Sequence, residues 1–86
     1  MARYRLTIKP SAAKEIEAIV PKKDRQRIVR CISELAENPF PPGAQKLSGQ
    51  RRYRIRWEKY RILYEVDVGE LVVLVVKVGH RTDVYR

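Results

Sequence analysis

Residues 51–66, with the sequence RRYRIRWEKYRILYEV, constrain the fold more than any other stretch of the chain. Polar and apolar side chains alternate on both sides of Glu58 and Lys59, which is the pattern of two β-strands joined by a tight turn. A turn at these two residues pairs Ile55 with Ile62. We therefore predict an antiparallel hairpin with one largely apolar face and one face rich in arginine.

The arginine-rich face of this hairpin brings like charges together. In the expected register, Arg56 lies directly opposite Arg61, and Arg54 lies opposite Leu63. Like charges opposite each other destabilise a sheet by about 0.2–1 kcal/mol per pair. A bound phosphate would neutralise them, because a guanidinium donates two parallel hydrogen bonds to phosphate oxygens and can stabilise charge that develops during displacement at phosphorus. A solvated polar face is the alternative.

Elsewhere, the periodicity predicts one strand followed by two helices. Residues 3–9 alternate like an edge strand that Pro10 ends, and Ser11 is a suitable N-cap for a short helix. The apolar residues of this helix are Ala12, Ala13, Ile16, Ile19 and Val20. A second helix is expected from about Pro21 to Glu37, with an apolar stripe of Ile28, Ile32 and Leu35, widened by Val29, Cys31 and Ala36.

The remainder of the chain is predicted to be a loop and then sheet. Residues 38–49 are rich in proline and glycine, so we expect a loop without chemistry. Residues 71–78, LVVLVVKV, read as a central strand, and Gly79 is expected to let the chain turn as it leaves that strand. The element order predicts a single α+β domain over residues 1–86, with a mainly antiparallel sheet and a helical hairpin packed on one face.

The charge balance indicates a polyanionic partner. The chain has 19 Lys and Arg residues against 10 Asp and Glu residues, which gives a formal net charge of +9. Nucleic acid is the commonest partner of such a surface, and a plain solvated basic surface is the alternative. The outward side of the second helix carries five of the cations: Lys22, Lys23, Arg25, Arg27 and Arg30.

Several other classes of protein are disfavoured. Cys31 is the only cysteine, so an intrachain disulfide and a zinc-binding cysteine cluster are excluded. No apolar stretch has the length of a signal peptide or a transmembrane helix. We therefore expect a cytoplasmic protein that does not bind membranes.

The end of the chain, KVGHRTDVYR, gathers further candidate residues. His80, the only histidine, adjoins Arg81, and Tyr85 follows. A histidine beside an arginine suits proton transfer, although a lone histidine is more often structural. Tyr85 is suited to stacking on a base or simply to packing at the terminus.

These segments resemble the RelE family of bacterial toxins, in the RelE/ParE superfamily. The resemblance spans nearly the whole chain and is strongest in YRIR, YRILYEV and VGHRTDVYR, with the spacing NP…KLSG in support. It implies a metal-independent endoribonuclease that cleaves messenger RNA in the ribosomal A site. The 2′-hydroxyl attacks the adjacent phosphate, which leaves a 2′,3′-cyclic phosphate and a 5′-hydroxyl.

The resemblance also implies roles for individual residues. Its basic active-strand positions fall on Arg54 and Arg56, its further arginines on Arg61 and Arg81, and its catalytic or stacking tyrosine on Tyr85. Well-studied relatives carry lysines in place of Arg54 and Arg56. Because arginine does not give up its proton, His80 becomes the candidate general base.

The same resemblance implies partners. They are a RelB-like antitoxin that covers the arginine face, the ribosome with its mRNA, and operator DNA reached only through the antitoxin complex. The basic side of the second helix would dock on ribosomal RNA.

Two other functions stay open. One is a ParE-like gyrase-inhibiting toxin without nuclease activity, and the other is a non-catalytic nucleic-acid-binding module. A cluster of arginines converging on one point favours the nuclease, because a gyrase binder has no need of a phosphate site, and a binding module would spread its cations along a groove.

Overall fold

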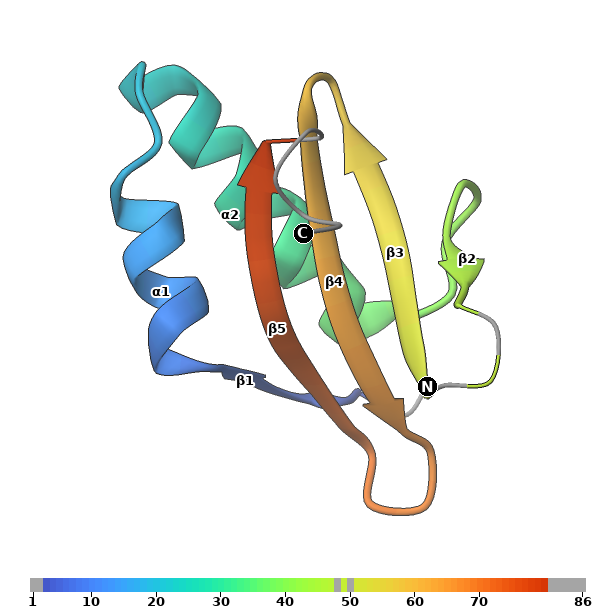
Figure 1. The fold of residues 1–86 in the computed structure, drawn as a ribbon. Helices are drawn as coiled ribbons and strands as arrows, with labels where there is room; N and C mark the ends of the chain where they lie inside the picture. Colours follow the sequence, from blue (N-terminus) through green and yellow to red (C-terminus); the bar gives the residue numbers. More distant parts are fainter. Residues whose placement is uncertain (1–2, 48, 50, 81–86) are drawn as a thin grey trace.

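The computed structural model describes residues 3–47, 49 and 51–80. The elements follow the order β1 (Arg5–Ile8), α1 (Pro10–Glu17), α2 (Lys22–Glu37), β2 (Gln45–Lys46), β3 (Arg52–Trp57), β4 (Tyr60–Asp67) and β5 (Val72–His80). The strands form one sheet in the order β1-β5-β4-β3-β2, in which only the β1–β5 pair is parallel. Both helices lie on the same side of the sheet (Figure 1), so the expected α+β arrangement is confirmed.

The hairpin of β3 and β4 has the register expected from the sequence. Ile55 pairs with Ile62, Arg56 with Arg61 and Arg54 with Leu63. The turn consists of Glu58 and Lys59, and Glu58 adopts a left-handed conformation with φ 55°. A positive φ at the first turn residue matches the twist of the paired strands, which fixes the two-residue connection.

A one-residue bulge in β5 decides which of its side chains face the helices. Tyr64 pairs with Val75 but Leu63 pairs with Lys77, so Val76 is an extra residue in β5. Simple alternation from Val75 would place Lys77 in the core. The bulge instead gives the next helix-facing position to Val78, which is 2% exposed, and moves Lys77 to the opposite face.

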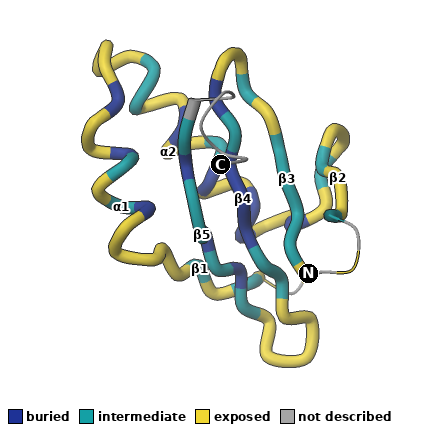
Figure 2. The backbone as a smooth tube through the Cα atoms, in the orientation of Figure 1, coloured by how far each residue is buried: buried dark blue, intermediate teal, exposed yellow. Residues whose placement is uncertain are grey.

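The core lies between α2, α1 and the inner strands. The fully buried members contributed by α2 and the sheet are Ile28, Ile32, Leu35, Ile62, Tyr64, Val73, Val75 and Val78. Figure 2 shows buried positions along β4 and β5, with exposed positions at the turns. The predicted stripe of the second helix is therefore the one that packs on the sheet.

Aromatic rings extend the core toward the start of β3. Tyr64 stacks on Tyr53 with ring centroids 5.8 Å apart, and Phe40 meets Tyr53 edge to face at 5.2 Å. The Tyr64 hydroxyl donates a hydrogen bond of 2.7 Å to the carbonyl oxygen of Pro39. This bond joins the central strand to the segment that leaves α2.

Three details of the helices differ from the sequence-based expectation. Ser11 is not the N-cap of the first helix, because Pro10 occupies its first turn, where a missing N–H is tolerated, and Lys9 is the N-cap. Val20 is 75% exposed, because α1 ends at Glu17 and the helical period no longer applies. Val29 is 47% exposed, because it lies one position round the helix from the stripe.

Two expectations about the sheet were also wrong. The segment 38–49 is not all loop, because Gln45 and Lys46 pair with Arg54 and Tyr53 as strand β2. Gly79 does not mark the exit from the last strand, because β5 continues to His80. The ladder with β4 persists there, with Gly79 opposite Arg61.

None of the described helices is long and apolar enough to cross a membrane.

The phenol of Tyr64 makes stability sensitive to alkaline pH. Burial, and then the neighbouring Tyr53 and Cys31, raise the pKa of Tyr64 from 10.0 to about 12. The folded state therefore favours the neutral phenol, so its contribution is complete below pH 10 and is lost as the pH rises toward 12.

We expect Tyr64→Phe to unfold more easily than the wild type at pH 9, by about 1 kcal/mol, because the bond to Pro39 is lost. Between pH 9 and pH 11 this gap should change by about 1.4 kcal/mol in favour of Tyr64→Phe, enough to cancel or slightly reverse it, because only the wild type must keep the phenol of Tyr64 protonated in order to fold. Urea unfolding at both pH values measures the gap. A gap that stays constant would contradict the assignment.

Candidate active site on the arginine face

The face of the sheet opposite the helices carries the arginines in rows set by the register. One row runs from Arg56 through Arg61 to Gly79, and the next runs from Arg54 through Leu63 to Lys77. Paired residues of an antiparallel sheet have Cβ atoms about 5 Å apart, so each row is a set of direct neighbours. We call this surface the arginine face.

Two of the arginines on this face are held by neighbouring side chains. The Nε atom of Arg52 donates to Oε2 of Glu65 at 3.0 Å, in a pair that is half exposed. A terminal nitrogen of Arg54 donates to the amide oxygen of Gln45. Arg52 is therefore paired with a carboxylate, whereas one of the contacts that orient Arg54 is to a neutral amide.

Arg56 and Arg61 form the centre of the face. Arg56 is exposed and makes no ion pair with the described residues, while Arg61 is half-buried and its Nε atom is buried. Gly79 completes their row without a side chain, so no side chain of β5 stands in this row beside Arg61. An anion that approaches this row meets two guanidinium groups on a rigid pair of strands.

The remaining predicted catalytic residues lie at the end of β5 and beyond it. The backbone of His80 pairs with that of Tyr60, one position past the row of Arg56 and Arg61. Arg81 and Tyr85 lie outside the described residues. The register thus brings Arg54, Arg56 and Arg61 to neighbouring positions on one face, and the catalytic roles assigned to all six residues stay predictions.

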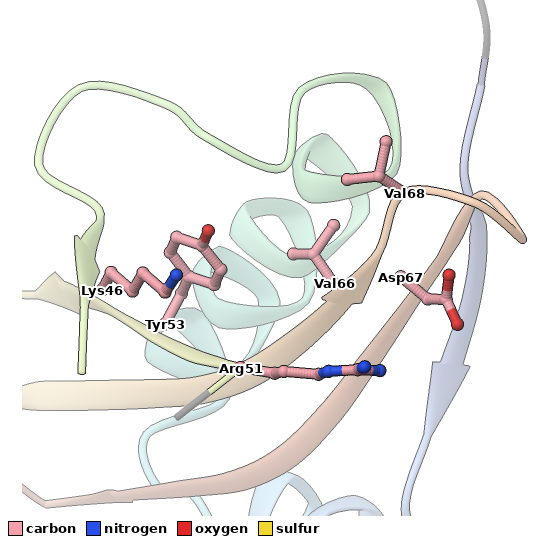
Figure 3. A pocket seen from close by; sticks show the side chains of 6 residues that line it. All are labelled: Lys46, Arg51, Tyr53, Val66, Asp67 and Val68. Atoms are coloured by element: carbon pink, nitrogen blue, oxygen red, sulfur yellow. The ribbon is translucent and has the colours of Figure 1, made fainter. Parts of the chain in front are cut away.

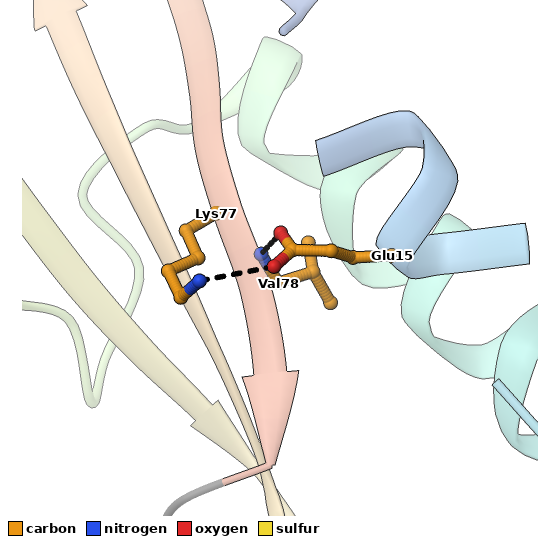
Figure 4. A network of polar contacts seen from close by, with 3 residues as sticks. All are labelled: Glu15, Lys77 and Val78. Atoms are coloured by element: carbon orange, nitrogen blue, oxygen red, sulfur yellow. Dashed lines mark hydrogen bonds and ion pairs between the residues drawn. The ribbon is translucent and has the colours of Figure 1, made fainter. Parts of the chain in front are cut away.

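The bulge places Lys77 on the arginine face, and Lys77 forms an ion pair with Glu15 of α1. Its Nζ lies 3.0 Å from Oε2 of Glu15, while Oε1 of Glu15 accepts a 3.0 Å hydrogen bond from the backbone N–H of Val78 (Figure 4). β1 pairs with β5 only as far as Val75. Beyond that residue this edge of β5 has no neighbouring strand among the described residues, and the Glu15 carboxylate accepts the hydrogen bond from the backbone N–H of Val78 there. Glu15 thereby fixes α1 against the part of β5 that flanks the arginines.

A hollow near the start of β3 and the end of β4 is separate from this centre. It is lined by Lys46, Arg51, Tyr53, Val66, Asp67 and Val68. In Figure 3 the carboxylate of Asp67 points away from Lys46 and Tyr53. The hollow lies at the opposite end of the hairpin from the turn, so it is not continuous with Arg56 and Arg61.

The cations of the second helix are placed as expected, with one exception. Lys22, Lys23, Arg27 and Arg30 are exposed, whereas Arg25 is half-buried. Among the described residues, no group of three His, Cys, Asp or Glu side chains gathers in a way that suits a metal ion.

Comparison with known proteins identifies the family. Residues 6–85 match the family model described as the ParE toxin of the type II toxin–antitoxin system, parDE. A "Putative RelE-like toxin protein" from Escherichia coli is 31% identical over 89 residues, which covers 98% of this chain and 92% of that protein. The chain therefore belongs to the toxins of type II toxin–antitoxin systems, in the RelE family of the RelE/ParE superfamily.

Solved structures agree with this assignment. The archaeal RelE–RelB complex from Pyrococcus horikoshii OT3 contains a chain that is 27% identical, with a TM-score of 0.82, and the match covers 96% of this chain and 99% of that one. The intact E. coli RelBE toxin–antitoxin complex contains one that is 29% identical, with a TM-score of 0.76, and that match covers 90% and 95%.

Sequence reasoning missed two residues of the arginine face. Gln45 was assigned to a loop, because nothing in the sequence around it indicated a strand that pairs with β3 and brings a partner to Arg54. Lys77 was hidden because alternation alone places it in the core. Glu65 as the partner of Arg52 was recoverable, since it follows from counting the Ile55–Ile62 register outward by three pairs.

The contact of Glu15 with β5 yields a prediction about stability. We expect Glu15→Ala to lower the free energy of unfolding by about 1–2 kcal/mol, because the Val78 N–H loses its acceptor. Glu17→Ala is the matched control on the same helix. Glu17 is exposed and makes no hydrogen bond or ion pair with the described residues, so its removal should cost less than about 0.5 kcal/mol. Urea unfolding of both variants tests this, and equal losses would show that the contact contributes nothing.

Proposed function

We propose that this toxin is a ribosome-dependent endoribonuclease that cleaves messenger RNA in the A site, in the cytoplasm. The observation that supports the proposal best is the direct pairing of Arg56 with Arg61 on the face of the sheet opposite the helices. Like charges placed directly opposite each other on a sheet repel, and a bound anion would relieve that repulsion. The scissile phosphate of an RNA strand is such an anion.

In the proposed reaction, the ribose 2′-oxygen forms a bond to the adjacent phosphorus as the bond from phosphorus to the 5′-oxygen breaks. The 2′-hydroxyl gives its proton to a base, and the leaving 5′-oxygen takes one up. The products are a 2′,3′-cyclic phosphate and a 5′-hydroxyl. Negative charge on the phosphate oxygens grows in the transition state, and preorganised cations stabilise it there more than in the ground state.

Each candidate residue has a part in this mechanism. Arg56, Arg61 and Arg81 hold the scissile phosphate, and Arg54, oriented by Gln45, positions the 2′-oxygen or the neighbouring backbone. His80 transfers the proton, since arginine cannot act as a base at neutral pH. Tyr85 stacks on the codon or assists the leaving oxygen.

The arginine face is also suited to binding an antitoxin. The P. horikoshii and E. coli relatives are known in complexes with RelB. We propose that a RelB-like antitoxin covers the arginine face of this toxin with an acidic or amphipathic segment, which suits a chain of net charge +9. Operator DNA would be bound only through that complex.

The ParE description of the matching family model makes gyrase inhibition the second candidate. The grouping of Arg54, Arg56 and Arg61 favours the nuclease, because binding a protein target requires no phosphate site.

The test is an assay on translating ribosomes. The wild type should cut mRNA within the codon awaiting tRNA, and Arg61→Ala should lose at least ~100-fold in rate. Arg3→Ala, which removes an exposed arginine outside the sheet, is the control and should cut like the wild type. Intact mRNA together with stabilised gyrase–DNA breaks would transfer the assignment to the ParE-like function.

The part assigned to His80 has its own test. His80→Gln should slow cleavage roughly 100-fold at neutral pH while leaving binding to the ribosome unchanged. It should also remove the fall in rate on the acid side of neutrality, where a histidine base becomes protonated. Wild-type rates with an unaltered pH profile would show that His80 is structural.

A further inference from the structure

A second hollow lies at the tip of the β3–β4 hairpin, where it meets the start of α2. It is lined by Lys23, Asp24, Arg27, Trp57, Glu58 and Lys59, and we call it the tip hollow. The Tyr60 hydroxyl donates a 3.3 Å hydrogen bond to Oδ2 of Asp24, which ties the hairpin to the helix beneath the hollow. Burial and the Asp24 carboxylate raise the pKa of Tyr60, so the phenol keeps the proton that this bond requires.

The aromatic wall of the tip hollow is preformed. Trp57 is half-buried and lies nearly parallel to the ring of Tyr60, with an interplanar angle of 11° and centroids 6.2 Å apart. Lys59 places its ammonium 5.6 Å from the centroid of the Tyr60 ring. An indole held in this way loses little freedom when a flat ligand stacks on it.

Three cations surround this indole. Lys23 and Arg27 are one helical turn apart on α2 and are exposed, and Lys59 is exposed on the turn. The hollow also contains two carboxylates, of which Asp24 is engaged by Tyr60 and Glu58 is exposed at the turn. An aromatic face flanked by cations is the arrangement that binds an unpaired nucleotide, with the base on the ring and the phosphate on the cations.

The tip hollow neighbours the arginine face along β3 but lies on the other side of the sheet. Trp57 directly follows Arg56 in β3, and successive residues of a strand point to opposite faces. An RNA strand that contacts both sites would therefore wrap around the tip of the hairpin, from the indole on one side to Arg56 and Arg61 on the other.

We propose that the tip hollow binds an unpaired ribonucleotide, whose base stacks on Trp57 and whose phosphate contacts Lys23, Arg27 and Lys59. The inference rests on the proposed action on RNA and adds a binding subsite to it. It also separates the cations of α2 into Lys23 and Arg27, which line this site, and the other three, which do not. An acidic peptide would satisfy the cations but would not use the flat face of the indole.

The experiment uses the intrinsic fluorescence of Trp57, which is the only tryptophan in the chain. A short single-stranded oligoribonucleotide should quench this fluorescence saturably, whereas inorganic polyphosphate, a polyanion without bases, should bind with little quenching. Binding of labelled RNA, followed by fluorescence anisotropy, should weaken roughly tenfold in Trp57→Leu, while polyphosphate binding stays unchanged. A circular dichroism melt checks that the variant is folded.

A pair of double variants tests the cations without altering the core. Lys23→Ala with Arg27→Ala should weaken RNA binding and lower the slope of log affinity against log salt by up to about 0.7, since both cations contact the same phosphate and about 0.7 is lost per phosphate of a single strand. Lys9→Ala with Lys14→Ala removes the same charge from exposed positions near and on α1 and should retain both the slope and the quenching.

Three results would overturn the inference: RNA that binds without quenching Trp57, equal losses for RNA and polyphosphate in Trp57→Leu, or equal effects of the two double variants. The test is independent of the nuclease proposal, because it uses free RNA. Quenching by RNA in a protein that leaves mRNA intact on ribosomes would refute only the nuclease, and cleavage without quenching would refute only the tip hollow.

Discussion

The register of the three inner strands is the constraint on which the site depends. Ile55 against Ile62 fixes β3 on β4, and the extra residue Val76 fixes β5 on β4. A one-residue slip of a strand exchanges its two faces, which would bury guanidinium groups and expose the core. The apolar contacts with α2 therefore hold the arginines in place from the other side of the sheet. The bulge in β5 completes this arrangement, because it keeps Val78 in the core and places Gly79 beside Arg61.

The distribution of counter-charges shows how the sheet tolerates its own repulsion. Glu65 neutralises Arg52 at one end of the hairpin, and Glu15 pairs with Lys77 at the edge of β5. Arg54 is held by the uncharged Gln45. Neither of these two ion pairs involves Arg56 or Arg61, and the carboxylate closest to Arg56 along the hairpin is that of Glu58, which is exposed at the turn. An anion bound at this row would further relieve the repulsion between its cations.

Much of this was predictable from the sequence because it depends on local patterns. Alternation and a two-residue turn were enough to place Arg56 opposite Arg61, and the period of α2 identified Ile28, Ile32 and Leu35. The failures arose where tertiary contacts override such patterns. The bulge at Val76 has no signature in a run of valines, since every position is compatible with either face. β2 is two residues long and exists because β3 offers a free edge to it, which the composition of residues 38–49 does not encode. Trp57 and Lys23 are 34 positions apart, and only the packing of the hairpin on α2 brings them to one hollow.

The arginine face and the tip hollow, on the two sides of the hairpin tip, would recognise different parts of an RNA strand. A phosphate site made of arginines gives strong binding but cannot distinguish one segment of polyanion from another, because every nucleotide carries the same phosphate. An indole beside it responds to the flat base of an unpaired nucleotide, which double-stranded RNA does not offer. Because Arg56 and Trp57 are consecutive in one rigid strand, a substrate that satisfies both must have an unpaired base at a fixed distance from the bound phosphate. On the proposed function, the hairpin would therefore select for single-stranded RNA through its geometry alone, before any chemistry at the arginine face.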